Sequence, residues 1–241
     1  MNAGHRAVRR LIVNADDFGQ SAGINEGVIR CHERGILTSA SLMVRWPHAT
    51  AAAEYARSAR GLSVGLHVDL GEWEYRNGKW TAVHTVLRSE DPAEIKSEIE
   101  FQLETFQRMT GYAPTHLDSH QHVHRSAPWG RIVTDLGAAL GVPVRHCSDV
   151  VKYEGSFYGQ GGKGEAFDDG VTVKSLIGIL RALPPGTTEL GCHPGLGGDA
   201  QGMYVAQREQ EVTALCDPQV RAAMEAEDIQ LISFRDLRPR H

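Results

Sequence analysis

The sequence predicts an α/β fold with a parallel sheet, built as one domain over residues 1–241. Short runs of apolar and β-branched residues alternate with longer stretches of helical period about six or seven times, which is typical of successive βα units. The chain has 241 residues, a length at which a single α/β barrel is common. Parallel strands can close into a barrel or remain an open sheet, and the alternation alone does not separate these two architectures.

The predicted strands are the short apolar runs, which we expect to form the sheet with helices between them. In chain order they are Leu11–Asn14, Ser39–Val44, Ser63–His67, Thr115–Asp118, Pro143–Arg145, Thr188–Cys192 and Gln230–Ser233.

One helix is predicted with particular clarity after Asp91. Asp91 is a suitable N-cap, Pro92 suits the first helical position, and Glu94 stands three residues after the cap. Gly111 is expected to end the helix. The apolar positions at helical spacing are Ile95, Ile99, Leu103 and Phe106.

Between Tyr153 and Gly170 the alternation gives way to a glycine-rich segment, which we expect to be a loop. A phosphate-binding loop would need a glycine five residues before Gly162, and Phe157 occupies that position. The segment is therefore predicted to form a flexible part of a rim rather than a nucleotide site.

Composition and charge describe an ordinary globular protein. Hydrophobic residues make up 41% of the chain and charged residues 23%, which is too apolar for a disordered segment. The formal net charge of -5 argues against a nucleic-acid-binding protein, which normally concentrates a basic excess on one face. We expect a small-molecule partner and no nucleic acid, and the sequence leaves open a homo-oligomer.

The sequence also predicts no membrane segment and no export signal. The apolar run Leu11–Val13 is too short for the core of a signal peptide. No stretch approaches the roughly 20 apolar residues that span a bilayer. The four cysteines lie far apart without a metal-binding spacing, so we expect reduced thiols and a cytoplasmic protein.

Polar side chains follow directly after several of the predicted strands. Because the carboxyl ends of parallel strands meet in one crevice, we expect these side chains to converge in space although they are far apart in the sequence. Such a layout is typical of an active site. The residues are Asp16, Asp17, His67, Asp118, His120 and His193.

The pair Asp16 and Asp17 has two interpretations. Adjacent carboxylates repel each other unless a cation lies between them, and a divalent ion could bind one carboxylate and leave the other free as a base. The alternative is an ordinary turn, because Asp and Gly are common turn residues and Gly19 follows closely. The pair alone does not decide between them.

A second motif places His or Asp at every even position from 116 to 124, the period that lines one face of an extended chain. Imidazole and carboxylate are preferred ligands of zinc and related divalent ions. The alternative is a hydrogen-bonded histidine cluster on the surface. The spacing does not say which of His120, His122 and His124 is a ligand, and His120 lies nearest the strand end.

His67 and His193 each have an ordinary interpretation when taken alone. His67 would more often be a packed histidine than a ligand, and the Pro194-Gly195 sequence after His193 resembles a strand-to-turn junction. If both point into the crevice that holds the carboxylate pair, a hydrolytic metal centre is the simplest account.

These motifs together resemble the YdjC-like (ChbG/HpnK) family of carbohydrate deacetylases. The resemblance covers about residues 10 to 235 and implies a distorted (β/α) TIM-like barrel of six to eight parallel strands, related to polysaccharide deacetylases. It also implies a divalent metal, Mg²⁺ or Zn²⁺, and an N-acetylated saccharide substrate. The motifs that carry it are Val13–Gly19, Gly35–Val44, Val64–His67, Pro114–His124 and Glu189–Gly195.

Carried over position by position, the resemblance implies that Asp17, His67 and His120 bind the metal. Asp16 then resembles the catalytic base, and His193 resembles the general acid that protonates the leaving amine. A histidine with a pKa near the operating pH suits that role.

Aromatic residues outside the motifs are the expected substrate contacts. Trp73, Phe157 and Tyr158 lie in two stretches that we expect to face the substrate, and Trp73, Tyr75 and Trp80 could stack on a sugar. An equally good interpretation of these three aromatic residues is that they anchor loops. Two rival functions also remain open, namely a barrel metallohydrolase acting on a phosphoester or another amide, and a binding module with a vestigial metal site.

Overall fold

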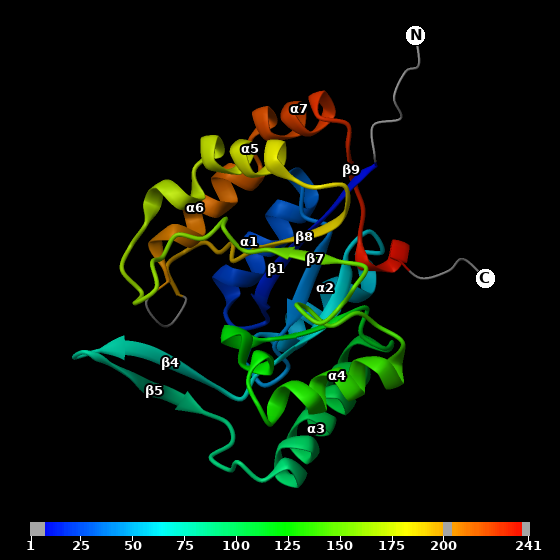
Figure 1. Ribbon diagram of the computed structural model, residues 1–241, viewed down its shortest axis with the longest axis vertical. Coiled ribbons are helices and arrows are strands. Elements are labelled where there is room, and N and C mark those ends of the chain that lie inside the picture. The colour runs from blue at the N-terminus through cyan, green and yellow to red at the C-terminus, as the bar shows by residue number, and fades with distance from the viewer. Residues whose placement is uncertain (1–7, 200–203, 238–241) are drawn as a thin grey trace.

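The computed structural model describes residues 8–199 and 204–237, so both ends of the predicted domain lie partly outside the described residues. Its centre is a parallel sheet of seven strands in the order β6-β3-β2-β1-β8-β7, with β9 pairing to β1 (Figure 1). The sheet curls into an incomplete barrel, which confirms the predicted distorted barrel of parallel strands. The strands are β1 (Arg9–Phe18), β2 (Ser39–Leu42), β3 (Ser63–Val68), β6 (Leu117–Ser119), β7 (Lys152–Glu154), β8 (Gly186–Cys192) and β9 (Ile229–Leu231).

Helices connect the strands and surround the sheet. Figure 1 shows α5, α6 and α7 grouped on one side and α3 with α4 on the other. No helix in the described part of the chain is long and apolar enough to cross a membrane. The helices are α1 (Ala22–Arg34), α2 (Ala49–Ser58), α3 (Pro92–Thr110), α4 (Trp129–Leu140), α5 (Val173–Ala182), α6 (Ala206–Leu215) and α7 (Pro218–Ala226), and the 3-10 turns are η1 (His120–Arg125), η2 (Asp168–Val171) and η3 (Phe234–Leu237).

The hydrophobic core lies between the sheet and its helices. Leu11, Ile12 and Val13 of β1 are fully buried, as expected for a central parallel strand covered on both faces. The core therefore holds the carboxyl ends of the central strands in fixed positions.

Helix α3 begins and ends where the sequence predicts. The Asp91 side chain accepts a hydrogen bond from the Ala93 N–H at 2.9 Å, and Gly111 ends the helix in the left-handed conformation at φ 82°. Of the predicted apolar face, Ile95, Ile99 and Phe106 are fully buried and Leu103 is half-buried.

One predicted strand needs correction, and one hairpin was not predicted. Residues 143–145 form no regular strand, because only Val144 makes a parallel bridge, to Leu117. A hairpin of β4 (Gly71–Arg76) and β5 (Lys79–Thr85) was not predicted, although its Asn77-Gly78 turn has the positive φ angles, 52° and 82°, that a tight hairpin requires. This hairpin forms a separate two-stranded antiparallel sheet.

Candidate metal centre and active site

All the predicted site residues line one cavity of about 210 Å³ at the carboxyl ends of the central strands. Asp16 and Asp17 lie near the end of β1 and His67 near the end of β3, while His120 and His193 directly follow β6 and β8. Trp73 comes from the hairpin, and Phe157 and Tyr158 come from the glycine-rich segment. The predicted convergence of these side chains is therefore observed. They are Asp16, Asp17, His67, Trp73, His120, Phe157, Tyr158 and His193.

Asp17, His67 and His120 form a compact donor cluster, with one ligand atom of each residue within 4.8 Å of the others. The Asp17 Oδ1 atom lies 3.0 Å from His120 Nδ1 and 3.5 Å from His67 Nε2. The buried His120 Nε2 atom has no hydrogen-bond partner among the described residues. One carboxylate and two imidazoles are a donor set that fits a divalent cation.

A second group of donors, Asp16, His67 and Asp118, is equally compact. There, however, the Arg145 guanidinium contacts Asp16 at 2.6 Å and Asp118 at 2.8 Å. A metal ion there would have to compete with Arg145 for both oxygen atoms of Asp16, whereas Arg208 binds only the Oδ2 atom of Asp17 and leaves Oδ1 facing the histidines. The cluster around Asp17 is therefore the better candidate for a metal.

Asp118 orients the His67 ring. Its Oδ1 atom lies 2.7 Å from His67 Nδ1, which leaves Nε2 directed toward Asp17. Carboxylates commonly hold metal-binding histidines in this way. Burial lowers the pKa of His67, but the Asp118 and Asp16 carboxylates raise it more, and the pKa lies well above its usual value.

Asp17 is held in an unusual backbone conformation, with φ 65°, which is uncommon for a residue with a side chain. Its Oδ2 atom accepts a hydrogen bond from Arg208 Nη2 at 2.6 Å, which leaves Oδ1 facing the two histidines. Burial raises the pKa of Asp17, but Arg208 and His120 outweigh this and keep the pKa well below its usual value. Asp17 is therefore an ionised, correctly aimed donor.

Asp16 forms a two-point ion pair with Arg145, at 2.6 Å and 2.7 Å. Arg145 Nε also donates to Glu189 at 2.8 Å, so one buried guanidinium serves several carboxylates. Burial raises the pKa of Asp16, but Arg145 lowers it more, and the net result is a lowered pKa. Asp16 is consequently ionised at neutral pH and able to accept a proton.

His193 faces Asp16, with Nε2 at 3.8 Å from the Asp16 Oδ2 atom. Its backbone N–H donates to Glu211, which also accepts a hydrogen bond from the Tyr204 hydroxyl. Burial lowers the pKa of His193 to about 4, so the ring is neutral in the resting site. The sequence predicts for His193 a pKa near the operating pH, whereas the pKa of His193 in the resting site is lower.

Glu211 offers a test of these electrostatics. Burial raises the pKa of Glu211 to about 8 from its usual value of 4.5. Between these two pH values the Glu211 carboxyl is protonated in the folded protein and ionised in the unfolded chain. The resulting stabilisation is complete below about pH 4.5 and is lost as the pH rises toward 8. We expect the free energy of unfolding to fall over this range by a few kcal/mol through Glu211 alone.

Urea unfolding of the wild type and of Glu211→Gln between pH 5 and 8 checks this expectation. The amide side chain of the variant cannot ionise, so the free energy of unfolding of the variant should fall less between pH 5 and 8 than that of the wild type. Both proteins keep the fall caused by Glu189, whose pKa is raised to about 7. Parallel pH curves for the two proteins would contradict the assignment.

The predicted row of His and Asp residues does not run along a single strand. Gln121 and His122 have φ angles of 50° and 54°, so the chain turns after β6. His116 stacks on Phe234 with ring centroids 3.9 Å apart, away from the cavity. His124 is buried, and its two ring nitrogens form hydrogen bonds with the Ser119 hydroxyl and the Arg145 carbonyl, so its role is structural.

His122 lines the cavity, but its ring lies outside the compact donor cluster. Burial lowers the pKa of His122 to about 3. Its buried Nδ1 atom has no hydrogen-bond partner in the described chain. His120 thus remains the predicted ligand.

Three functional side chains were not singled out from the sequence. Arg145 ends a predicted strand, so the argument that found the other site residues applied to it as well. Arg208 and Glu211 lie on α6 and carried no comparable signal, because charged residues at that spacing are usually exposed on a helix. Both are buried here, at 5% and 0% exposure.

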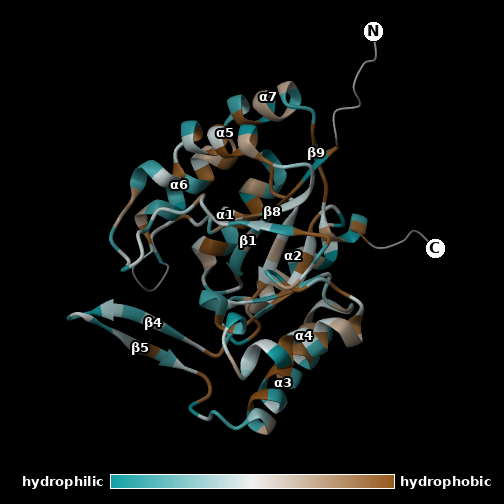
Figure 2. Cartoon of the chain, in the orientation of Figure 1, coloured by the Kyte–Doolittle hydropathy of each residue, from teal (hydrophilic) through white to brown (hydrophobic). Residues whose placement is uncertain are grey.

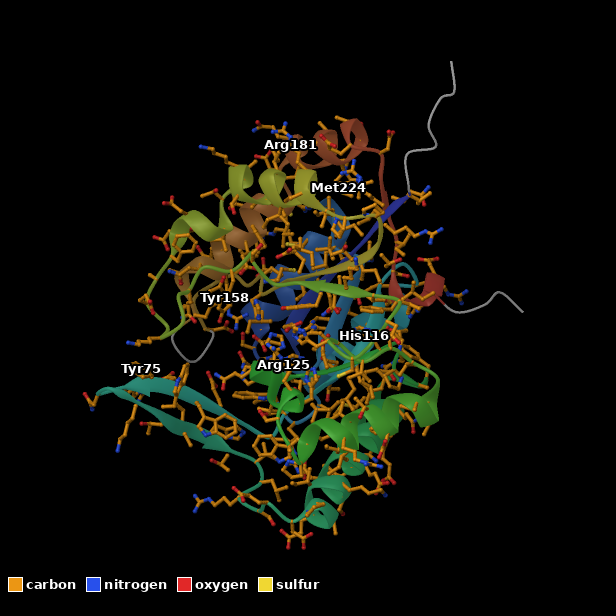
Figure 3. All side chains as sticks on the ribbon, in the orientation of Figure 1. Tyr75, His116, Arg125, Tyr158, Arg181 and Met224 are labelled. Carbon is orange, nitrogen blue, oxygen red and sulfur yellow. The ribbon has the colours of Figure 1, made fainter. Side chains whose placement is uncertain are left out.

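The predicted substrate contacts occupy the cavity wall in different ways. Phe157 is fully buried in the core, while Tyr158 stacks on Tyr204 at 4.8 Å and lies 5.1 Å from the His193 ring. Trp73 of β4 is half-buried. Figure 3 shows Tyr158 on the glycine-rich segment above the hairpin that carries Tyr75.

The overall structure is similar to that of known proteins. A protein of Enterococcus faecalis, named for a proposed cleavage of cellobiose-phosphate, matches with a TM-score of 0.77 at 24% identity, covering 96% of this chain and 99% of that one. A family 4 carbohydrate esterase of Streptomyces lividans, solved with acetate, matches with a TM-score of 0.54 at 14% identity, covering 95% of both chains. These matches show the class of the fold, a distorted barrel of parallel strands that the chain shares with both proteins.

Sequence comparison identifies the family more closely. The model of the YdjC-like protein family matches residues 10–226, and the chain belongs to this family. Among curated relatives, the carbohydrate deacetylase of Geobacillus stearothermophilus is 32% identical, covering 95% of this chain and 98% of the relative. The chitooligosaccharide deacetylase of Serratia marcescens is 31% identical, covering 94% of this chain and 98% of the relative.

Proposed function

We propose that this protein is a metal-dependent deacetylase that removes acetyl groups from N-acetylated sugars. The observation that carries the proposal is the presence, in one cavity, of the Asp17/His67/His120 cluster with an ionised Asp16 and a neutral His193 beside it. The names of the relatives support the reaction and the substrate class.

The divalent ion would be held by Asp17, His67 and His120, with Mg²⁺ and Zn²⁺ both compatible with the donors. When bound, such an ion supplies a Lewis acid that polarises a carbonyl group and makes water more acidic. Arg208 and Asp118 keep Asp17 and His67 aimed correctly from outside the cluster.

Asp16 is the proposed base. Its carboxylate is ionised, and Arg145 fixes both of its oxygen atoms, so it can accept a proton from the attacking water without reorienting. The same ion pair makes Asp16 a weak base, which favours passing the proton onward.

His193 is the proposed acid. Its Nε2 atom lies 3.8 Å from Asp16, so a small movement brings the two groups within proton-transfer distance. His193 is neutral at rest and can receive the proton from Asp16. It then donates this proton to the leaving amine, which is a poor leaving group unless protonated.

Metal analysis together with acetate release tests the proposal. The purified protein should contain about one divalent ion per chain and release acetate from N-acetylated chitooligosaccharides but no phosphate from phosphoesters. Phosphate release without acetate release would instead identify the rival metallohydrolase. Full metal occupancy with no turnover on either panel would identify a binding module with a vestigial site.

The setting of this reaction is also part of the proposal. We propose that the enzyme acts in the cytoplasm as a single domain on small saccharides. All four cysteines are free thiols, which supports a reducing compartment.

A further inference from the structure

Two of the four cysteines lie next to each other although they are far apart in the sequence. Cys31 is in α1 and fully buried, and Cys216 directly follows α6 and is half-buried. Their Sγ atoms lie 4.0 Å apart. Neither cysteine is among the described residues that line the catalytic cavity, so the reaction proposed above does not use this pair.

Cys216 lines a small surface cavity of about 250 Å³ between the end of α1 and the α6–α7 connection. Figure 2 shows hydrophilic residues along α7, the helix that follows Cys216, as expected for a helix at the surface. A small molecule can therefore approach Cys216, whereas Cys31 is covered. The charged side chains that line the cavity are Arg34, Asp217, Arg221 and Glu225, two of each sign, which suits a neutral molecule.

The surroundings of Cys216 favour its thiolate form. The hydrogen bond with Cys31 and the guanidinium groups of Arg30 and Arg34 lower the pKa of Cys216 to about 7, although burial acts in the opposite direction. The hydrogen bond with Cys216 and burial raise the pKa of Cys31, which therefore stays a thiol beside the thiolate. A thiolate that small molecules can approach is typical of cysteines that react with peroxides.

We propose that Cys31 and Cys216 form a redox-active pair, in which a hydroperoxide oxidises Cys216 and Cys31 then closes a reversible disulfide between α1 and α6. The two sulfur atoms, now 4.0 Å apart, have to approach by about 2 Å to reach the S–S bond length of about 2.05 Å. Disulfides that form in a reducing compartment are usually transient and respond to oxidants.

Two steps convert the thiols into the disulfide, written here for hydrogen peroxide. The Cys216 thiolate attacks one peroxide oxygen and the O–O bond breaks. The leaving hydroxide takes the proton that Cys216 released, which gives a sulfenic acid and water. The Cys31 sulfur then attacks the Cys216 sulfur, the S–O bond breaks, and the hydroxide leaves as water with the Cys31 proton. The two sulfurs have together lost the electron pair that reduced the peroxide.

The disulfide fastens the helix that supports the catalytic cavity. Helix α6 carries Arg208, which donates to Asp17 and to the His193 carbonyl, and the bond ties the C-terminal end of this helix to α1. A cross-link between residues 185 positions apart also restricts the unfolded chain, which stabilises the folded protein. Oxidation should therefore raise Tm by roughly 5 to 10 °C.

The experiment treats the reduced protein with hydrogen peroxide and maps its peptides under non-reducing conditions. We expect a linked pair of peptides that carry Cys31 and Cys216, a rise in Tm of the size given above, and loss of both on adding dithiothreitol. Cys216→Ser should abolish both effects. Cys147→Ser is the matched control and should change neither, because Cys147 is exposed and is not part of the pair. Loss of the response in Cys147→Ser overturns the proposal.

A trapping measurement tests the order of the two steps. In Cys31→Ala the sulfenic acid on Cys216 has no thiol beside it, so dimedone, which labels sulfenic acids, should label Cys216 far more than in the wild type. Equal labelling of Cys216 in both proteins overturns the proposal. A wild-type peptide map in which Cys216 is oxidised further while Cys31 stays a free thiol does so as well, even if the variant fails to fold. None of these measurements depends on deacetylase activity.

Discussion

The variant His120→Ala is expected to lose its divalent metal and to lose activity by roughly 10³-fold or more, since metal ions contribute several kcal/mol to such reactions. His120 is one of the three members of the donor cluster, and its Nδ1 atom lies 3.0 Å from Asp17 Oδ1. Asp17→Ala and His67→Ala should behave in the same way. The fold should survive, because the hydrophobic core lies elsewhere.

His122→Ala is the matched control for that experiment. His122 is two residues away and lines the same cavity, but it lies outside the donor cluster, so the variant should keep its metal. Metal content by mass spectrometry and circular dichroism of each variant provide the measurements. If His120→Ala keeps a full equivalent of metal and His122→Ala loses it, the ligand assignment is wrong.

The cavity could be predicted from the sequence because of a single topological rule. Parallel strands end at the same edge, so polar residues placed after separate apolar runs must converge there. Asp16, His67 and His193 follow this rule, and the structure brings them together. Arg145 follows it as well, since it ends the predicted strand at 143–145, but only carboxylates and histidines after the strands were singled out from the sequence.

Other parts of the site depend on tertiary packing that no local pattern reveals. From a helix that follows the last long strand, Arg208 reaches the cavity and Glu211 reaches the backbone N–H of His193, and only the packing of α6 shows that both are buried. The hairpin of β4 and β5 is a similar case. The Asn77-Gly78 turn signals a hairpin, but its position beside the cavity depends on the Gln121 side chain.

The variant His193→Ala is expected to retain metal and to lose roughly 10²- to 10⁴-fold in kcat/KM on an acetamide substrate. The reason is the leaving group, since an amine must be protonated before it departs. An activated ester has a leaving group that needs no proton, so the same variant should lose much less on that substrate. The two substrates are compared on the same enzyme preparation, by acetate release.

The pH dependence distinguishes how His193 obtains its proton. Burial lowers its pKa to about 4, so at pH 6 to 8 the ring is almost entirely neutral in the resting enzyme. If the proton comes from Asp16 during the reaction, wild-type kcat/KM should show no loss between pH 5 and 8. An acid with this pKa that had to be protonated beforehand would instead lose about tenfold in kcat/KM for each pH unit above about 4. Equal losses of His193→Ala on amide and ester would mean that His193 positions the substrate, because only protonation of the amine separates the two reactions.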